Sequence, residues 1–296
     1  MKKNCIYLVD GSGYIFRAYH ALPPLYRKKD GIPTGAVLGF INMINKLIET
    51  NFSNGLATHL AIIFDKGSKT FRNEIYTEYK ANRGETPEDL IPQFQLIKDA
   101  TKVFNILMIE KEGFEADDII ASYSKLAVKE GFDVKIVSSD KDLMQLIAPG
   151  ISMLDPMKNK IIGEKEVIEK FGVRPDKVID VQSLAGDSSD NIPGIPGIGI
   201  KTAAELINKF GDLDTLLKKA NEIKQPKRRE RLTEFSENAI LSRKLVTLKS
   251  DIKINLPLDK FKYALPDYEQ VIAFLKEMEF NSLVNRISRD NEYIEK

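Results

Sequence analysis

Three short apolar runs, each followed by an aspartate, constrain the fold of this chain more than any other feature. The runs and their aspartates are residues 6–9 with Asp10, residues 60–64 with Asp65, and residues 134–137 with Asp140. The first two runs are almost continuously apolar, which is typical of buried strands in a parallel sheet. Functional groups in such sheets collect beyond the carboxyl ends of the strands. We therefore expect the three aspartates to share one edge of a sheet.

Helical segments are expected between these strands, at about residues 35–50 and 117–130. The second of them ends at Gly131, a natural residue just past the end of a helix. Alternating strands and helices predict a right-handed α/β domain with a mostly parallel sheet. We place this core at residues 1–160.

Residues 67–92 form a polar insertion that mixes charged and aromatic side chains without the apolar periodicity of a core helix. A long insertion after a catalytic strand is typical of a mobile or substrate-handling segment. At its end, Thr86 predicts an N-cap and Pro87 a first helical residue, for a helix that runs to about Phe104.

The second half of the chain is more helical and more basic. Residues 199–231 carry nine Lys and Arg against five Asp and Glu. We predict a smaller helical unit over residues 161–260. A last amphipathic helix is expected from Asp267 to Glu279, within a C-terminal segment (residues 261–296) that packs back on the core.

Composition removes several classes of site. Cys5 is the only cysteine, so the chain has no internal disulfide and no thiolate zinc site. His20 and His59 are the only histidines, which disfavours a His-led triad. No apolar run approaches the roughly 18 residues of a membrane span. The apolar run after Met1–Asn4 is too short for a signal peptide, so we expect a cytoplasmic protein.

Nine carboxylates fall at the ends of predicted strands or the starts of predicted helices. They are Asp10, Asp65, Glu115, Asp117, Asp118, Asp140, Asp142, Asp187 and Asp190. Gathered in one pocket, they would repel one another until divalent cations fill it, and such a pocket suits metal-assisted hydrolysis of phosphodiesters. Simpler interpretations exist for each acid alone: the first turn of a helix favours acids, and a lone Asp often caps a helix or makes a turn.

A glycine-rich segment, residues 194–202, is expected to bind an anion. Gly197 and Gly199 precede a helix and present backbone N–H groups, with Lys201 and Thr202 beside them. The segment fails the Walker pattern, in which Gly and Lys are adjacent, and it lacks the third glycine of the dinucleotide pattern. We interpret it as a hairpin between two helices that grips a DNA phosphate, the alternative being a plain linker. The basic run 227–231, typical of a solvated helix face when taken alone, would extend that surface.

Taken in order, these motifs resemble those of the 5′-nuclease family, which includes flap endonucleases and the N-terminal 5′→3′ exonuclease domain of bacterial DNA polymerase I. The motifs that carry the resemblance are residues 8–11, 64–65, 79–83, 115–118, 139–142 and 186–191. The resemblance implies a PIN-like α/β core, a helical arch at about residues 67–92, and a helix–three-turn–helix DNA-binding unit.

The resemblance also implies roles for individual residues. A first metal would be held, directly or through water, by Asp10, Asp65, Glu115, Asp117 and Asp118, and a second would be surrounded by Asp140, Asp142, Asp187 and Asp190. The cationic residues that act on the substrate would be Lys80 and Arg83 in the arch and Arg17 beneath it. The duplex-binding turn would comprise Gly194, Gly197, Gly199, Lys201 and Thr202. The implied cofactors are two Mg²⁺ or Mn²⁺ ions, with a K⁺ ion at the hairpin.

The function implied is structure-selective 5′→3′ exonuclease and 5′-flap endonuclease activity on DNA with a flap, nick or 5′ end, as in primer removal and repair. The enzyme would be a monomer that works with a polymerase domain in the same or a separate chain. Two other functions stay open. A PIN-type single-strand ribonuclease explains the acids but leaves the hairpin idle, and a non-catalytic branched-DNA binding module would lack an acid, whereas all nine are present.

Overall fold

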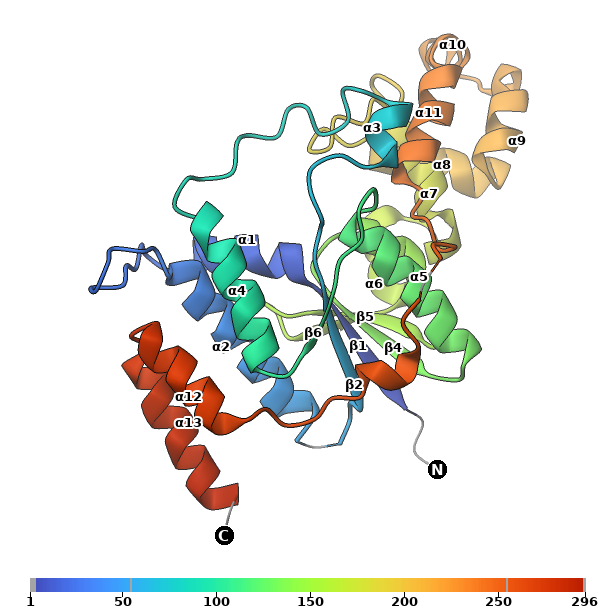
Figure 1. Ribbon diagram of the computed structural model, residues 1–296. Helices are drawn as coiled ribbons and strands as arrows, with labels where there is room; N and C mark the ends of the chain where they lie inside the picture. The colour runs from blue at the N-terminus through green and yellow to red at the C-terminus, as the bar shows by residue number, and fades with distance from the viewer. Residues whose placement is uncertain (1–3, 54, 254, 295–296) are drawn as a thin grey trace.

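The computed structural model describes residues 4–53, 55–253 and 255–294 (Figure 1). Met1 to Lys3, which belong to the segment considered above as a signal peptide, lie outside this part of the chain. The fold is built on one six-stranded sheet in the order β3-β2-β1-β4-β5-β6. The strands are β1 Cys5–Asp10, β2 His59–Ile63, β3 Leu107–Ile109, β4 Asp133–Val137, β5 Ile151–Asp155 and β6 Lys160–Ile162.

Every pair of neighbouring strands from β3 to β5 is parallel, and only β6 runs antiparallel to its neighbour. The mostly parallel sheet expected from the apolar runs is therefore confirmed. Its last strand ends at Ile162, two residues beyond the predicted limit of the core, and the predicted division of the chain remains a prediction.

The central strand β1 supplies a core to each face of the sheet. Ile6 and Leu8 pack with the helix α5 (Ala116–Lys129), whereas Tyr7 and Val9 pack with helices on the opposite face. All four side chains are almost fully buried. This alternation follows from the two-residue period of a strand, and burial on both faces explains the continuous apolar run.

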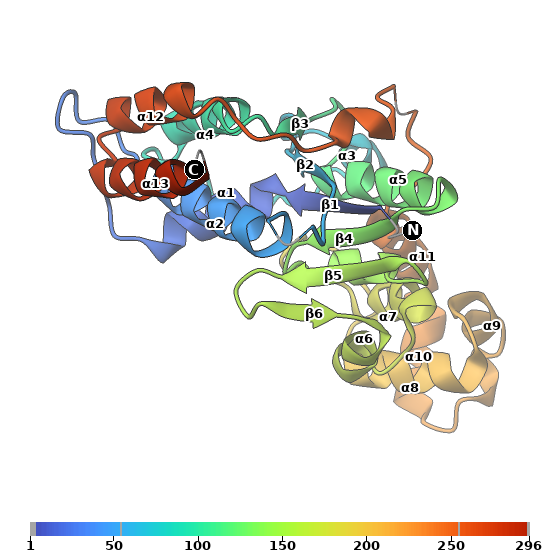
Figure 2. The ribbon, with the colours of Figure 1, turned by 90° about the horizontal axis from the view of Figure 1, so that it is seen from below.

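Helices cover both faces of this sheet (Figures 1 and 2). The first face packs on α1 Gly11–Ala21, α2 Gly35–Asn51, α4 Ile91–Val103 and α12 Tyr268–Glu277. The second packs on α5 Ala116–Lys129 and on the helices that follow β6. Gly131 after α5 has a φ of 84°, as expected of a glycine that ends a helix.

The helical unit extends beyond the second face of the sheet (Figure 2). Its longer helices are α6 Glu164–Phe171, α7 Val178–Ala185, α8 Ile200–Phe210, α9 Leu213–Lys218, α10 Pro226–Glu234 and α11 Ser236–Val246. Most of its buried apolar side chains belong to the same cluster as α5, whereas Leu245 and Val246 of α11 pack in a small separate cluster with Tyr79. The unit and the sheet therefore share one hydrophobic core.

The arch segment differs from expectation. Between β2 and α4 it contains one helix, α3 Phe71–Ile75, and otherwise consists of turns and extended chain (Figure 1). The predicted start of α4 at Thr86 is also wrong. Pro87 to Leu90 form a turn closed by a 2.9 Å hydrogen bond, and the helix begins at Ile91.

The helix expected from Asp267 to Glu279 is α12, which spans Tyr268–Glu277. Asp267 caps it by accepting hydrogen bonds from the N–H groups of Glu269 and Gln270. Val271 and Leu275 of α12 are fully buried against the first face. A further helix that was not predicted, α13 Asn281–Ile294, pairs with α12. None of the helices in the described ranges is long and apolar enough to cross a membrane.

Candidate active site

The aspartates that follow the strands meet at one edge of the sheet, because β2, β1 and β4 are parallel neighbours. Asp10 ends β1 and caps α1: its carboxylate accepts the N–H of Gly13 and the hydroxyl of Ser138, each at 2.8 Å. Asp65 accepts the N–H of Ala116 at 2.7 Å and so caps α5. These bonds orient the carboxylates by ordinary capping chemistry.

The first acid group consists of Asp10, Asp65, Glu115 and Asp117. Burial and, next, the charge of Asp140 raise the pKa of Asp117 well above its usual value. Burial, with smaller contributions from Asp140 and Asp65, raises the pKa of Asp10 to about 6. Carboxylates raise one another's pKa values only when they lie close together, so these acids lie close to one another in the fold.

The second acid group consists of Asp140, Asp142, Asp187 and Asp190. Asp140 lies between the two groups and accepts the N–H of Asp142 at 2.8 Å. This bond lies at the start of a short 3₁₀ helix, Asp142–Leu146, where the sequence offered the start of an ordinary helix. Burial and the charge of Asp140 raise the pKa of Asp142 to about 7, although Gln182 donates a hydrogen bond to it.

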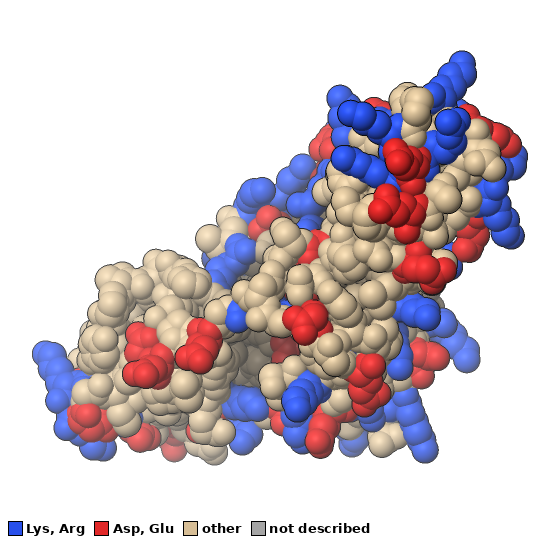
Figure 3. Space-filling view, turned by 90° about the horizontal axis from the view of Figure 1, so that it is seen from above, with Lys and Arg blue, Asp and Glu red and all other residues tan. Residues whose placement is uncertain are grey.

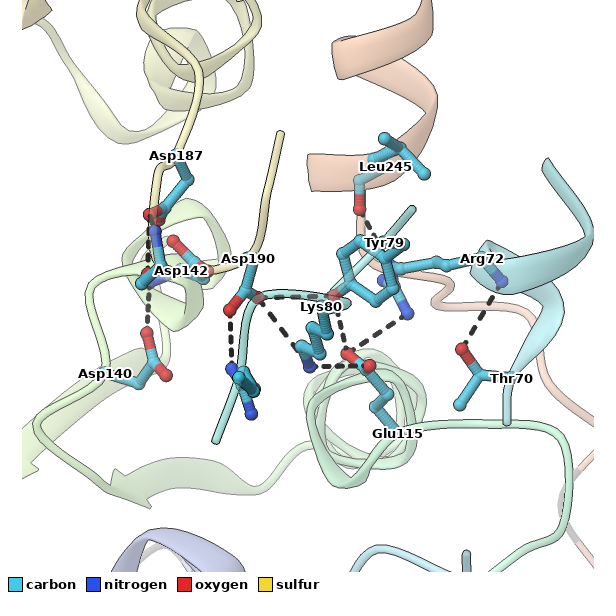
Figure 4. A network of polar contacts seen from close by, with 12 residues as sticks. Thr70, Arg72, Tyr79, Lys80, Glu115, Asp140, Asp142, Asp187, Asp190 and Leu245 are labelled. Atoms are coloured by element: carbon cyan, nitrogen blue, oxygen red, sulfur yellow. Dashed lines mark hydrogen bonds and ion pairs between the residues drawn. The ribbon is translucent and has the colours of Figure 1, made fainter. Parts of the chain in front are cut away.

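Four side-chain cations pair with three acids of these groups and with Asp118 (Figure 4). Lys80 lies 2.6 Å from Glu115 and 3.7 Å from Asp190, so it bridges the two groups. Figure 4 shows Asp190 between Lys80 on one side and Asp142 with Asp187 on the other. The full set of ion pairs is Lys80 with Glu115 and Asp190, Arg83 with Asp190, Lys141 with Asp187, and Arg72 with Glu115 and Asp118.

The acids of the described chain do not have the geometry of a preformed metal site. Within the described ranges, no three His, Cys, Asp or Glu side chains already form a group able to hold a metal ion. The donors themselves fit a hard divalent cation, since they are all carboxylate oxygens. At Glu115, Asp187 and Asp190, a divalent cation would take the place of the paired ammonium and guanidinium groups.

Tyr79 is a site residue that the sequence analysis did not single out. Its hydroxyl lies 3.2 Å from Glu115 and 3.3 Å from Asp190, and its side chain is buried. Its place in the motif 79–83, directly before Lys80, was the signal in the sequence. Tyr79 therefore links the first acid group to the second.

Asp118 is placed differently from the other predicted ligands. It is fully buried, and Arg72 donates two hydrogen bonds to it, at 2.7 and 2.8 Å. The N–H groups of Lys249 and Glu115 also donate to it, at 2.9 and 3.2 Å. Both oxygens of Asp118 are thus bound by protein donors, and its predicted role in metal binding, directly or through water, stays a prediction.

Arg72, also missed in the sequence, joins three parts of the chain. It lies on α3, holds Asp118 of α5, and donates from Nε to the carbonyl of Leu245 in α11 at 2.7 Å. Its side chain is only 1% exposed. The polar composition of the arch segment gave no indication that this arginine is buried.

Arg17 lines a cavity of about 460 Å³ that lies beside the two acid groups. It donates a hydrogen bond to the hydroxyl of Ser139, and Asp10 and Asp140 line the same cavity. The cavity therefore places a cation and two of the acids around a space that a phosphate group can enter.

The predicted hairpin joins α7 to α8. Gly197 has a φ of 74°, and a side chain on Gly194 would come within 2.4 Å of the backbone of Gly186. Gly199 caps α8, and Lys201 in its first turn is exposed. Thr202 follows on the same turn. Glycine at 194 and 197 thus meets a backbone requirement, and the N–H-rich end of α8 faces outward.

Arg231 lies directly over this hairpin. A Cβ on Gly197 would come within 1.6 Å of the guanidinium of Arg231. Lys and Arg side chains gather over this end of the molecule (Figure 3). The basic run 227–231 therefore adjoins the hairpin rather than a remote face.

Comparison with known proteins agrees with this geometry. The family model described as "5'-3' exonuclease, N-terminal resolvase-like domain" matches residues 5–172, and that described as "5'-3' exonuclease, C-terminal SAM fold" matches residues 173–269. A resolvase-like sheet with acids along one edge and an appended SAM fold defines a class of nucleases. The chain belongs to the 5′-3′ exonuclease family.

Two relatives illustrate the range of the family. The chain is 56% identical to a DNA polymerase I of Rhizobium leguminosarum over 97% of its own length and 29% of the relative. It is 37% identical to a 5'-3' exonuclease of Aquifex aeolicus over 96% of its length and 95% of the relative. The chain thus spans about a third of the polymerase I relatives, which it matches over 29–34% of their lengths.

Solved structures share the fold. A zinc-bound T5 5'-exonuclease superimposes with a TM-score of 0.70 at 22% identity, covering 99% of this chain and 100% of that one. The catalytic core of Rad2 in complex with DNA gives 0.62 at 17% identity, covering 93% and 88%. These matches confirm the PIN-like sheet with its appended helical unit.

Removing Arg72 should destabilise the fold strongly. We expect Arg72→Ala to lower the free energy of unfolding by about 3–5 kcal/mol, because Asp118 is left buried without its partner. Arg72→Lys should recover only part of the loss, since an ammonium does not replace the two-pronged guanidinium. Chemical denaturation measures both, with the exposed Arg174→Ala as control. An Arg72→Ala protein within about 1 kcal/mol of the parent would contradict this role.

Divalent-cation binding should release protons at mildly acidic pH. Asp10 and Asp142, with pKa values of about 6 and 7, are partly protonated at pH 6 and ionised at pH 8. Because ligands bind a metal in their ionised form, proton release should fall as pH rises from 6 to 8. Calorimetric titration of Mg²⁺ in buffers of different ionisation enthalpy measures it. Asp142→Asn should release fewer protons, and a release independent of pH would contradict the assignment.

Proposed function

We propose that this protein is a structure-selective 5′→3′ exonuclease and 5′-flap endonuclease that hydrolyses DNA phosphodiesters with two divalent cations. The observation that carries the proposal is the convergence of two acid groups at one edge of the sheet, directly beside the arch cations. Acids at that density, with raised pKa values, are characteristic of catalytic sites.

The residues present fit two ions of the Mg²⁺ or Mn²⁺ type. Asp10, Asp65, Glu115 and Asp117 would hold the first, and Asp140, Asp142, Asp187 and Asp190 the second. When bound, such a pair activates water and neutralises charge on the scissile phosphate and leaving oxygen. Asp118 is left out of the ligand set because its oxygens are bound to Arg72 and to backbone N–H groups.

The cations that now pair with the acids have a second role in this proposal. Lys80 and Arg83 would turn from Glu115 and Asp190 to the substrate phosphate, where they stabilise the charge that develops during cleavage. Arg17, at the cavity beside Asp10 and Asp140, would bind the 5′ strand as it enters. Lys80, Arg83 and Arg17 would thus bind phosphate, and the carboxylates would bind the metal ions.

The hairpin would hold the duplex downstream of the cut. Its N–H groups, Lys201, Thr202 and Arg231 suit phosphate contacts, and a K⁺ ion at Gly194 to Gly199 would complete the turn. Contacts to the backbone of DNA select structure rather than sequence. The substrate would be a 5′ flap, nick or 5′ end in replication and repair, with the enzyme acting as a cytoplasmic monomer beside a polymerase domain.

A metal-dependent cleavage assay on a labelled 5′ flap tests the proposal directly. We expect cleavage near the junction with Mg²⁺ and none with a chelator. Parallel incubation with single-stranded RNA separates the proposal from a PIN-type ribonuclease. Preference for RNA over flap DNA would overturn it.

Loss of an acid should abolish chemistry but spare binding. We expect Asp117→Ala and Asp140→Ala each to lower the cleavage rate at least about 100-fold, while affinity for flap DNA measured in Ca²⁺ stays near the parent value. Asp99→Ala, which removes a half-buried acid on α4 outside the two acid groups, is the control. Near-normal turnover in either site variant would defeat the two-ion assignment.

The hairpin contact should appear in the salt dependence of binding. Lys201→Ala should weaken duplex binding and reduce the slope of log affinity against log salt by about one. Lys276→Ala, an exposed lysine on α12, should leave both unchanged. A Lys201→Ala slope identical to that of the parent would remove this residue from the DNA-binding surface.

A further inference from the structure

Two asparagines join the arch to the loop that carries the second acid group. The side-chain amide of Asn82 donates to the carbonyl of Ser188 at 2.6 Å. The amide of Asn191 donates in the opposite direction, to the carbonyl of Glu78, at 2.7 Å. Arch base (residues 78–83) and acid loop (residues 187–192) are thereby held by a reciprocal clasp.

Backbone hydrogen bonds beside the two asparagines also belong to the clasp. The N–H of Lys80 donates to the carbonyl of Asp190 at 3.0 Å. Lys80 and Asn191 have φ values of 58° and 56°, in the left-handed region that asparagine tolerates and lysine rarely adopts. The acid loop is itself closed by two hydrogen bonds between Asp187 and Ile192, at 2.9 and 2.8 Å. A strained backbone persists only where its surroundings hold it.

The clasp differs in kind from the ion pairs beside it. Lys80 and Arg83 pair with carboxylates, and a divalent cation competes for those carboxylates. Asn82 and Asn191 are neutral donors to backbone carbonyls, which are not part of the ligand set. Cation binding would therefore release the ammonium of Lys80 and the guanidinium of Arg83 from the carboxylates and leave the clasp closed.

We propose that Asn82 and Asn191 are positioning residues, which keep Lys80 and Arg83 in register with the second acid group while their side chains move from carboxylate to substrate phosphate. This inference rests on the proposed function. Long side chains are placed by their Cα positions, and a misplacement of about 1 Å can cost a reaction roughly 100-fold. Both amides are used in the clasp, so neither asparagine is assigned a contact with the reacting phosphate.

The test uses two variants with matched controls. Asn82→Ala removes one amide, and Asn191→Gly removes the other while preserving the left-handed backbone. Asn208→Ala and Asn105→Gly are the controls: their amides also donate to backbone carbonyls, and Asn105 has a φ of 54°. Single-turnover cleavage of flap DNA should slow roughly 10- to 100-fold in the clasp variants. Binding of flap DNA in Ca²⁺ should stay within about twofold, and both controls should cleave like the parent.

Combining the two changes tests whether the asparagines act as one unit. The double variant should be little slower than either single variant, because one lost bond already opens the clasp. Rate losses that simply multiply would overturn the reciprocal arrangement. A parent-like rate in Asn82→Ala would overturn the proposal as a whole.

A second measurement does not depend on activity. In saturating Mg²⁺ without DNA, the Lys80 amide should exchange hydrogen roughly tenfold faster or more in both clasp variants than in the parent and the controls. Slower cleavage with unchanged protection of this amide would contradict a positioning role. If the parent itself does not cleave flap DNA, the proposed function fails, whereas the exchange result still decides whether the clasp exists.

Discussion

The pair between Arg72 and Asp118 is the interaction on which the site depends. It ties the arch, through α3, to the start of α5 and to the end of α11. Taking two charges out of water costs several kcal/mol for each ion, and their attraction offsets that cost only when the remaining hydrogen bonds are satisfied. Here they are satisfied, because Asp118 also accepts from the N–H groups of Lys249 and Glu115.

The consequence of this pair is a fixed frame around a site whose own ion pairs can exchange. Glu115 and Asp117 lie next to Asp118 at the start of α5, so fixing Asp118 also fixes the direction of that first turn. Among the acids that remain, Glu115, Asp187 and Asp190 pair with Lys80, Arg83 and Lys141. Such pairs are partly exposed and exchange with other cations more readily than the buried pair does. The buried pair thus stabilises the fold, whereas the partly exposed pairs lie where the proposed chemistry takes place.

Much of the fold was predictable because it rests on local patterns. The continuous apolar runs predicted β1 and β2, and the aspartates after them predicted the shared edge. The start of α4 was wrong, since Thr86 and Pro87 make a good local capping signal that the chain uses for a turn instead. The helix α13 was missed because its short apolar stripe pairs with α12, which periodicity in a single segment does not reveal.

The site was predictable in outline but not in its division of labour. From the sequence, Asp117 and Asp118 are equivalent acids in one helical turn, and Arg72 is one charge among several in a polar insertion. In the structure Arg72 is paired with Asp118 and with Leu245, residues 46 and 173 positions away. Likewise, the partners of Asn82 and Asn191 lie more than 100 residues along the chain, at separations of 106 and 113.

The order of residues alone therefore determined the parallel sheet, the edge where its acids gather and the glycine turn that precedes α8. These follow from periods of two and about 3.6 residues and from backbone limits at single positions. Only the tertiary structure decided which acid is bound to protein donors and which are left for cations. Coulombic energies and hydrogen bonds depend on distances in space, and folding sets those distances between residues that the sequence keeps apart.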